Sequence, residues 1–366
     1  MKPSHLFAAA LSAAVAVSAS APGHAAPPTD GVTVDLDRPA EAEPDAGPWR
    51  LTIHSENDSN LYQPNSPSDR DYTAGNGFTL AWRPAFADDL ARRLPDLGGG
   101  FGDAPDTAFG VQAAQLIFTP VRIELERPQP DERPFAGYLF VGGYLQRASD
   151  DTLDHVQLDV GVLGSGSGAE QAQKLIHDVF PASTEPNGWD NQVHDEPALQ
   201  LTLRRKWRSD ADAASFDLAG LPLQAQAIPG VELELGNATR QLEASILGRV
   251  GYRLPDDFGP GRIFEPASFT GDPRTGWSGY LFGRLTGRVV EHDLFLEGSD
   301  FRNPRHPTVS KEPFVGEAAL GLAVGYRGEH WAVNLNYAQI YATQQYVEQD
   351  DAHSYGRYAL SVQRRF

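Results

Sequence analysis

Polar side chains that could ligate a cation follow one alternating apolar run of the sequence and precede the next. Asn57 and Asp58 end a run over residues 49–55, and Asp-Tyr-Thr at 71–73 comes just before a run over residues 77–83. In a hairpin these strand ends would meet, so carboxylate, amide and hydroxyl oxygens would share one small volume. Oxygen ligands of this kind suit a hard cation such as calcium. An ordinary turn is the alternative, because Asn and Asp also begin turns.

A second polar group lies on a segment that lacks strand alternation. Residues 164–180 begin with Gly and Ser and then place apolar residues at three- and four-residue spacing, which predicts an amphipathic helix that ends at Pro181. Gln173 and His177 are four residues apart and would share one face of this helix. His177 is then either a general base or a packed or solvated residue without chemistry.

The nucleophile motifs of common hydrolases are missing from the chain. It has no G-x-S-x-G elbow, no Cys and no H-E-x-x-H pattern, and its ten His residues are scattered. Hydrolytic chemistry would therefore rest on His177 activating a water molecule, with an oxygen-bound cation polarising the carbonyl under attack.

Composition and the first residues indicate an exported protein. A basic start, an Ala-rich apolar middle and small residues near Ala25 predict a signal peptide over residues 1–26, followed by a flexible, acidic, Pro-rich leader over 27–48. The chain has 366 residues, with 30 Lys and Arg against 49 Asp and Glu, for a net charge of −19. This charge disfavours a nucleic-acid partner, and the lack of Cys excludes disulfides and thiolate metal sites.

The remaining residues, 49–366, carry about twelve runs of alternating character. Runs of ten or more residues are long for a soluble β-sandwich and suit tilted membrane strands, so the fold expected is an all-β, antiparallel transmembrane barrel of about 12 strands with one short extracellular helix. An exported β-sandwich is the rival architecture. The expected strands cover residues 49–55, 77–83, 107–118, 135–145, 152–162, 196–208, 221–235 with a Pro-Gly interruption at 229–230, 243–254, 277–291, 315–327, 330–342 and 354–366.

Several short motifs follow one another along these runs. They are E-N-D at 56–58, D-R-D-Y-T-A-G at 69–75, R-P-F-A-G at 133–137, Q-A-Q-K-L-I-H at 171–177, G-W-D-N-Q at 188–192, D-E-P-A-L at 195–199 and L-F-L-E-G-S-D-F-R at 294–302. In this order, and over the chain from about Trp49 to Phe366, they resemble the outer-membrane lipid A 3'-O-deacylases and their wider relatives.

The resemblance implies an active site between the outer barrel wall and an extracellular helix. Calcium would help to stabilise the oxyanion there, while a His activates water to cleave an acyl ester of lipid A. Carried over by position, His177 matches the base, Gln173 matches a neighbouring helix residue, and Asn57, Asp58 and Thr73 match the strand-end residues that would hold the cation or the oxyanion.

The chain departs from the pattern of the family at one position. The family has a Glu six residues after its His, where this chain has Ser183, and Glu185 and Glu196 are the candidates to replace it. Arg122, Arg127 and Arg133 lie in the region where basic residues would grip the phosphates of lipid A.

The function expected is a calcium-dependent ester hydrolase of the outer membrane that removes the 3'-linked acyloxyacyl chain of lipid A. Its partners would be lipopolysaccharide and outer-membrane lipids, and a monomer is expected. A related esterase acting on phospholipid and a barrel without catalysis, serving as a passive pore or scaffold, are the alternatives.

Overall fold

The computed structural model describes most of the residues after the predicted leader. These are residues 47–58, 69–94, 105–179, 184–270, 274–299, 301 and 308–365. The predicted signal peptide (1–26) and residues 27–46 of the predicted leader lie outside these ranges.

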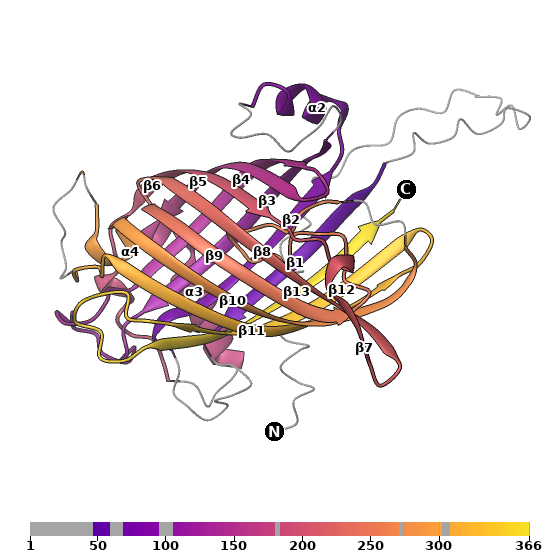
Figure 1. Ribbon diagram of the computed structural model, residues 1–366. Helices are drawn as coiled ribbons and strands as arrows, with labels where there is room; N and C mark the ends of the chain where they lie inside the picture. Colours follow the sequence, from indigo (N-terminus) through magenta and orange to yellow (C-terminus); the bar gives the residue numbers. More distant parts are fainter. Residues whose placement is uncertain are drawn as a thin grey trace, which may run out of the picture. The chain divides into compact units, whose positions relative to one another are not determined.

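Twelve antiparallel strands form a closed barrel (Figure 1). Their order is β6-β5-β4-β3-β2-β1-β13-β12-β11-β10-β9-β8, and pairing between β6 and β8 closes the sheet, which confirms the expected fold class. The strands are β1 (Trp49–Asn57), β2 (Asp71–Trp82), β3 (Asp106–Thr119), β4 (Ala136–Ala148), β5 (Thr152–Leu163), β6 (Glu196–Trp207), β8 (Leu221–Gly236), β9 (Thr239–Tyr252), β10 (Gly276–Asp293), β11 (Phe314–Arg327), β12 (Trp331–Ala342) and β13 (His353–Arg364). A thirteenth, short strand, β7 (Ser215–Leu218), pairs only with β8.

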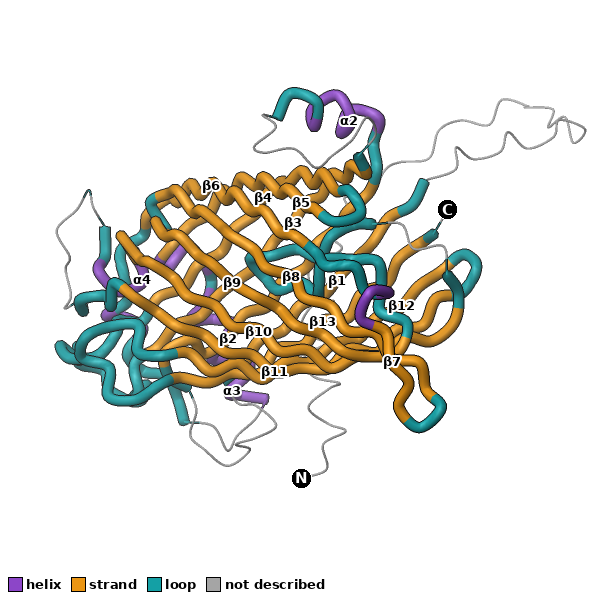
Figure 2. The backbone as a smooth tube through the Cα atoms, in the orientation of Figure 1, coloured by secondary structure: helices purple, strands orange, loops and turns teal. Residues whose placement is uncertain are grey.

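Helices connect the strands at both ends of the barrel (Figure 2). At the end where β1 begins and β13 finishes, termed the terminal end, α2 (Ala85–Ala91) joins β2 to β3. At the opposite end, termed the loop end, a 3₁₀ turn η1 (Gly164–Ser167) and α3 (Ala169–Val179) join β5 to β6, and α4 (Leu294–Glu297) follows β10. The helix predicted over 164–180 is therefore present as η1 and α3, whereas α2, α4 and β7 were not predicted.

Two strand predictions need correction. β2 begins at Asp71, six residues before the predicted start, because Gly75, Gly77 and an irregular pairing after Tyr72 hide its alternation in the sequence. The predicted interruption at Pro229 is wrong, because β8 runs through it. The ladder with β6 ends at Gly230, so Pro229 lies just outside it and its missing N–H removes no bond of that ladder.

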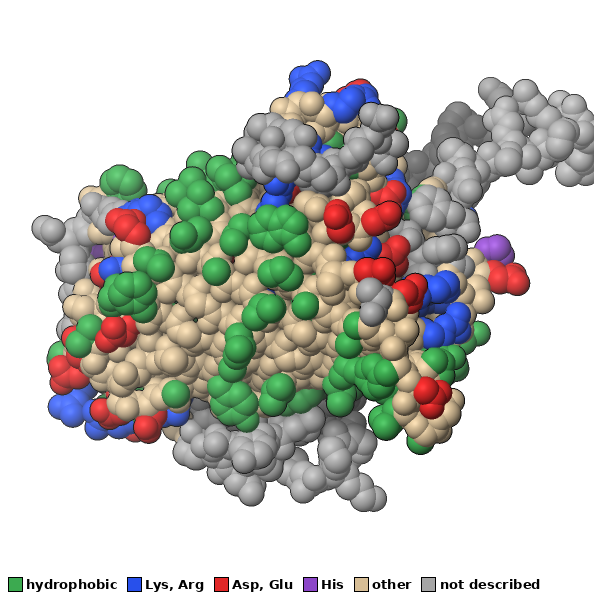
Figure 3. Space-filling model, viewed as in Figure 1, with side chains coloured by type: hydrophobic (Ala, Val, Ile, Leu, Met, Phe, Trp, Pro, Cys, Tyr) green, Lys and Arg blue, Asp and Glu red, His purple; other side chains and the backbone are tan. Residues whose placement is uncertain are grey.

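The alternation along the strands separates a polar interior from an apolar wall. On β10 the outward positions from Trp277 to Val289 are all apolar or Gly, while the inward positions include Arg284 and Arg288. Outward apolar side chains of this kind spread over the wall in Figure 3. An apolar band outside and polar side chains inside are the pattern of a barrel that lies in a membrane. Among the described residues, no helix combines the length and apolar character needed to cross a bilayer.

The segment between β9 and β10 folds back into the barrel. Phe258, Ile263 and Phe269 are buried there. Arg262 donates to Glu243 at 2.9 Å, and Glu265 accepts from Arg284 on the barrel wall at 2.6 Å. Polar and charged partners thus satisfy one another in the lumen, and protein fills its middle, which disfavours the passive-pore alternative.

Candidate active site

The helix α3 lies against the outer wall of the barrel, and Gly137 of β4 permits the close approach. A Cβ at Gly137 would overlap Ser167 Oγ and Ala169 Cβ. The hydroxyl of Ser167 accepts from the backbone N–H of Ala169 at 3.3 Å and so helps to start the helix. Gly168, at φ +69°, makes the left-handed turn between η1 and α3. Residues of the R-P-F-A-G and G-S-G-S-G stretches therefore determine where α3 begins and how closely it approaches the wall.

The buried face of α3 presents Ala169, Gln173 and His177, which are spaced four residues apart. His177 Nδ1 donates to the carbonyl oxygen of Thr184 at 2.6 Å, and its Nε2 lies 2.7 Å from Asp69 Oδ2. A ring whose two nitrogens both face acceptors can donate from both when it is protonated. The hydrogen bond to Asp69 raises the pKa of His177 above its usual value, although partial burial acts against this. The contact with Asp69 therefore favours the protonated form of the ring.

Gln173 fixes the position of that carboxylate. Its Nε2 donates to Asp69 Oδ2 at 3.3 Å, and its Oε1 accepts from the indole N–H of Trp189 at 2.8 Å. Trp189 is 1% exposed and packs against Phe135, with the ring centroids 5.0 Å apart. A buried aromatic thus orients the amide, and the amide and the imidazole together hold Asp69.

The strand-end residues predicted from the sequence do come together. Thr73 is the extra residue of a bulge in β2, a feature often found beside active sites. Its carbonyl oxygen accepts from the backbone N–H of Asp58 at 3.1 Å and from Asn57 Nδ2 at 3.3 Å, and its hydroxyl lies 2.7 Å from that of Thr119. Asp58 Oδ2 accepts from the backbone N–H of Arg70 at 3.0 Å. Because Arg70 follows Asp69, this bond links the strand ends to the His177 side of the site.

The carboxylate beside His177 is Asp69, which was not predicted from the sequence. It lies in the D-R-D-Y-T-A-G motif, whose strand-end position was the only signal that could have found it. The two candidates proposed instead have other surroundings: Glu185 is exposed, and Glu196 is buried at the start of β6, where it accepts from Asn237 at 3.0 Å. Ser183 lies outside the described residues.

The three arginines considered for phosphate binding differ in exposure. Arg133 is 1% exposed, stacks its guanidinium over Phe118 at 4.5 Å and faces the lumen, so it does not offer a surface charge. Arg122 and Arg127 are exposed on the loop between β3 and β4. That loop is tied to the Trp189 segment, because Asn191 Nδ2 donates to the carbonyl of Glu126 at 2.6 Å. Two exposed basic side chains therefore border the site.

The oxygen donors considered for a cation at the strand ends are the carboxylate of Asp58, the amide of Asn57 and the hydroxyl of Thr73. Within the described ranges, no cluster of three or more His, Cys, Asp or Glu side chains could hold a metal ion. A hard cation here would therefore depend on amide, hydroxyl and carbonyl oxygens as well as Asp58, which calcium accepts readily. The donor types fit calcium and do not fit a softer metal.

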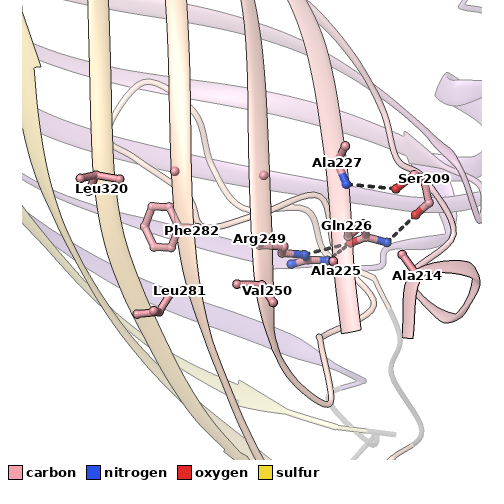
Figure 4. A pocket seen from close by; sticks show the side chains of 12 residues that line it. Ser209, Ala214, Ala225, Gln226, Ala227, Arg249, Val250, Leu281, Phe282 and Leu320 are labelled. Carbon is pink, nitrogen blue, oxygen red and sulfur yellow. Dashed lines mark hydrogen bonds between the residues drawn. The ribbon is translucent and has the colours of Figure 1, made fainter. Parts of the chain in front are cut away.

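A large groove lies elsewhere, on the wall near the β7–β8 hairpin. It measures about 570 Å³. Its polar groups are engaged with one another: Arg249 donates to Gln226, and Gln226 donates to the carbonyl of Ser209 at 2.7 Å (Figure 4). The remaining residues that the structure describes in this lining are apolar or Gly, and we assign no chemistry to this groove. Its residues are Ser209, Ala214, Ala225, Gln226, Ala227, Gly248, Arg249, Val250, Leu281, Phe282, Gly283 and Leu320.

Comparison with known proteins agrees with this architecture. The family model described as outer membrane protein LpxR matches residues 7–364. The solved structure of LpxR from Salmonella typhimurium is similar in fold, with 20% identity, 87% of this chain and 100% of that chain covered, and a TM-score of 0.64. More distant are the β domain of the Bordetella autotransporter BrkA (11% identity, 87% and 99% covered, TM-score 0.39) and the translocator domain of NalP from Neisseria meningitidis (10%, 89% and 90%, 0.37). A search of curated protein sequences finds no match.

The match to the family model covers nearly the whole chain, and the barrel shares its fold with a solved member. The resemblance read from the motifs is thus confirmed at the level of the family. The chain belongs to the LpxR family and is an outer-membrane β-barrel protein.

Proposed function

We propose that this protein is a calcium-dependent ester hydrolase that removes the 3'-linked acyloxyacyl chain of lipid A. Membership of the LpxR family supports the substrate class. The observation that carries the reaction class is the contact of 2.7 Å between His177 Nε2 and Asp69 Oδ2, on the outer side of the barrel wall where lipid lies.

The contacts of His177 define how it would act as a base. Its Nδ1–H is held by the carbonyl of Thr184 at 2.6 Å, so Nε2 is the nitrogen that exchanges a proton. In the neutral ring Nε2 carries the free lone pair, and a water that takes the place of Asp69 on this nitrogen would give it a proton as the water oxygen attacks the carbonyl carbon of the ester. Asp69 then stabilises the imidazolium that forms, and acts as a positioning residue.

The strand ends would hold the developing charge. Asn57, Asp58 and Thr73 would bind the cation, which when bound would stabilise negative charge on the ester oxygen. The hydrogen bond of 3.0 Å from the backbone N–H of Arg70 to Asp58 fixes the cation side of the site relative to the His177 side. Arg122 and Arg127, exposed on the neighbouring loop, would contact lipid phosphates.

The test is to incubate purified protein with mixed vesicles of lipid A and phospholipid and to measure both lipid classes by mass spectrometry. The proposal predicts loss of one acyloxyacyl chain from lipid A and no lysophospholipid. His177→Ala should lower the rate by about 10²- to 10⁴-fold, the usual contribution of a general base. Lys174→Ala, on the exposed face of the same helix, should leave the rate unchanged. Release of lysophospholipid instead would favour the phospholipid esterase, and full activity of His177→Ala would refute the mechanism.

A further inference from the structure

The surface of α3 that faces away from the barrel is divided into an apolar and a charged flank. Leu175, Ile176 and Val179 are 58%, 39% and 55% exposed. Glu170, Lys174 and Asp178 occupy the other flank, where Lys174 pairs with Glu170 at 2.6 Å. At 3.6 residues per turn, the centres of the two flanks lie about 150° apart around the helix axis. One face of the helix packs against the barrel. Of the other two, the apolar flank suits lipid and the charged flank suits water.

The helix α3 lies at one edge of the apolar band on the outside of the barrel wall. Near the terminal end, Arg147, Asp154 and Arg205 lie side by side on neighbouring strands and are paired at 2.7 and 2.6 Å. Gly137, against which α3 begins, lies ten positions from Arg147 along β4. With about 3.4 Å per residue and a tilt of about 40°, this separation spans about 26 Å along the barrel axis.

That height equals the thickness of the apolar band of outer-membrane barrels, about 25 Å. The row of paired charges therefore marks one boundary of the hydrocarbon region, and α3 lies at the other. Between them the outward residues are apolar: Leu139 lies opposite Val162, and Val141 lies opposite Val160. Leu139 and Val141 are 39% and 60% exposed, so the apolar wall continues up to the helix.

We propose that α3 is an interfacial helix, with Leu175, Ile176 and Val179 inserted among the lipid acyl chains of the outer leaflet. The charged flank faces headgroups and water. Three observations carry this proposal: the exposed apolar flank, its separation from the charged flank, and its continuity with the apolar wall. Under the proposed function, the ester would reach His177 by sliding in the plane of the bilayer and would not have to leave it.

Site-directed spin labelling tests the placement without any assay of activity. Because the chain has no Cys, single variants Leu175→Cys and Lys174→Cys can carry a nitroxide with no other change. The labelled proteins are reconstituted in phospholipid vesicles, and collision with oxygen is compared with collision with a water-soluble nickel chelate. The proposal predicts that the label at 175 lies about 5–10 Å inside the headgroup boundary. The label at 174 should be open to the nickel chelate, and Val141→Cys supplies a reference in the apolar wall.

Two results would overturn the proposal. A label at 175 as accessible to the nickel chelate as the label at 174 would place the flank in water. A label at 175 that is immobilised and shielded from both reagents would mean that another protein surface covers it. Neither result depends on catalysis, so the placement can fail while the proposed function stands.

A kinetic experiment, which rests on the proposed function, tests whether the apolar flank of α3 assists access of the substrate. Leu175→Glu places a charge near the interface and should raise KM for lipid A in vesicles by about fivefold, with kcat unchanged. Gln171→Glu adds the same charge on the polar side of α3, where the side chain is exposed, and should leave KM unchanged. Equal effects of the two variants would contradict insertion of the apolar flank.

Discussion

Replacing Gly137 by Ala should displace the His177 side of the site without harming the barrel. A Cβ at this position overlaps Ser167 Oγ and Ala169 Cβ. The hydroxyl of Ser167 can rotate away, whereas the methyl of Ala169 is fixed to the start of α3. That methyl has to retreat by about 1 Å to restore an ordinary carbon contact of about 3.5 Å.

A shift of this size at the start of α3 is passed on to its buried face. Gln173 and His177 hold Asp69 through contacts of 3.3 and 2.7 Å, and a displacement of about 1 Å breaks or lengthens both. Misplacement of a reacting group by 1 Å costs about 100-fold in rate, which corresponds to about 2.7 kcal/mol of transition-state stabilisation. We expect kcat/KM of Gly137→Ala on lipid A to fall by this factor.

A second glycine on the same strand supplies the matched control. Gly143 shares the outward face of β4, and the atom nearest to a Cβ there would be Phe109 Cζ, at an ordinary distance of 3.6 Å. Gly143→Ala should therefore keep the wild-type rate, and both variants should keep the thermal unfolding temperature of the barrel. A wild-type rate for Gly137→Ala, or an equal loss in both variants, would refute the argument that close approach of α3 positions the base.

Three further substitutions test the contacts of the site. Asp69→Asn removes the hydrogen bond that raises the pKa of His177, so the neutral base persists to lower pH. The acidic limb of the kcat/KM profile should therefore move to lower pH. An unchanged limb would show that Asp69 does not act on the ring. Asp58→Asn removes the carboxylate of the proposed cation ligands, so calcium titrations should give half-maximal activity at a higher calcium concentration than in the wild type. An unchanged titration would place the cation elsewhere. Trp189→Phe leaves the buried Gln173 oxygen without its donor, which costs about 1–3 kcal/mol, and hydrogen exchange of α3 should quicken while that of the barrel strands does not.

Much of the barrel could be predicted because membrane strands alternate over long runs. All twelve strands of the closed sheet were anticipated, since the outward residues of a strand such as β10 are apolar or Gly over seven successive outward positions. The short elements could not be predicted. α2 has seven residues, too few to be stable alone, and it forms because Ala87 and Ala91 pack against Leu145, far along the chain.

In the site too, contacts between residues close in the chain could be predicted, and contacts between distant residues could not. Gln173 and His177 could be paired from their spacing, because residues four apart share a helix face. Asp58 and Thr73 could be paired from the hairpin that joins β1 and β2. The contact of Asp69 with His177 joins residues 108 positions apart, and no periodicity encodes it. The burial of Arg133 was hidden for the same reason, because the lumen that encloses it is built from the whole barrel.

The most direct measurement is the mass spectrum of lipid A from Gram-negative cells that express this chain or its His177→Ala variant, with outer membranes incubated with calcium or with a chelator. We expect lipid A to lose one acyloxyacyl chain only when both His177 and calcium are present. Unchanged lipid A in every sample, or the same loss with His177→Ala, would contradict it.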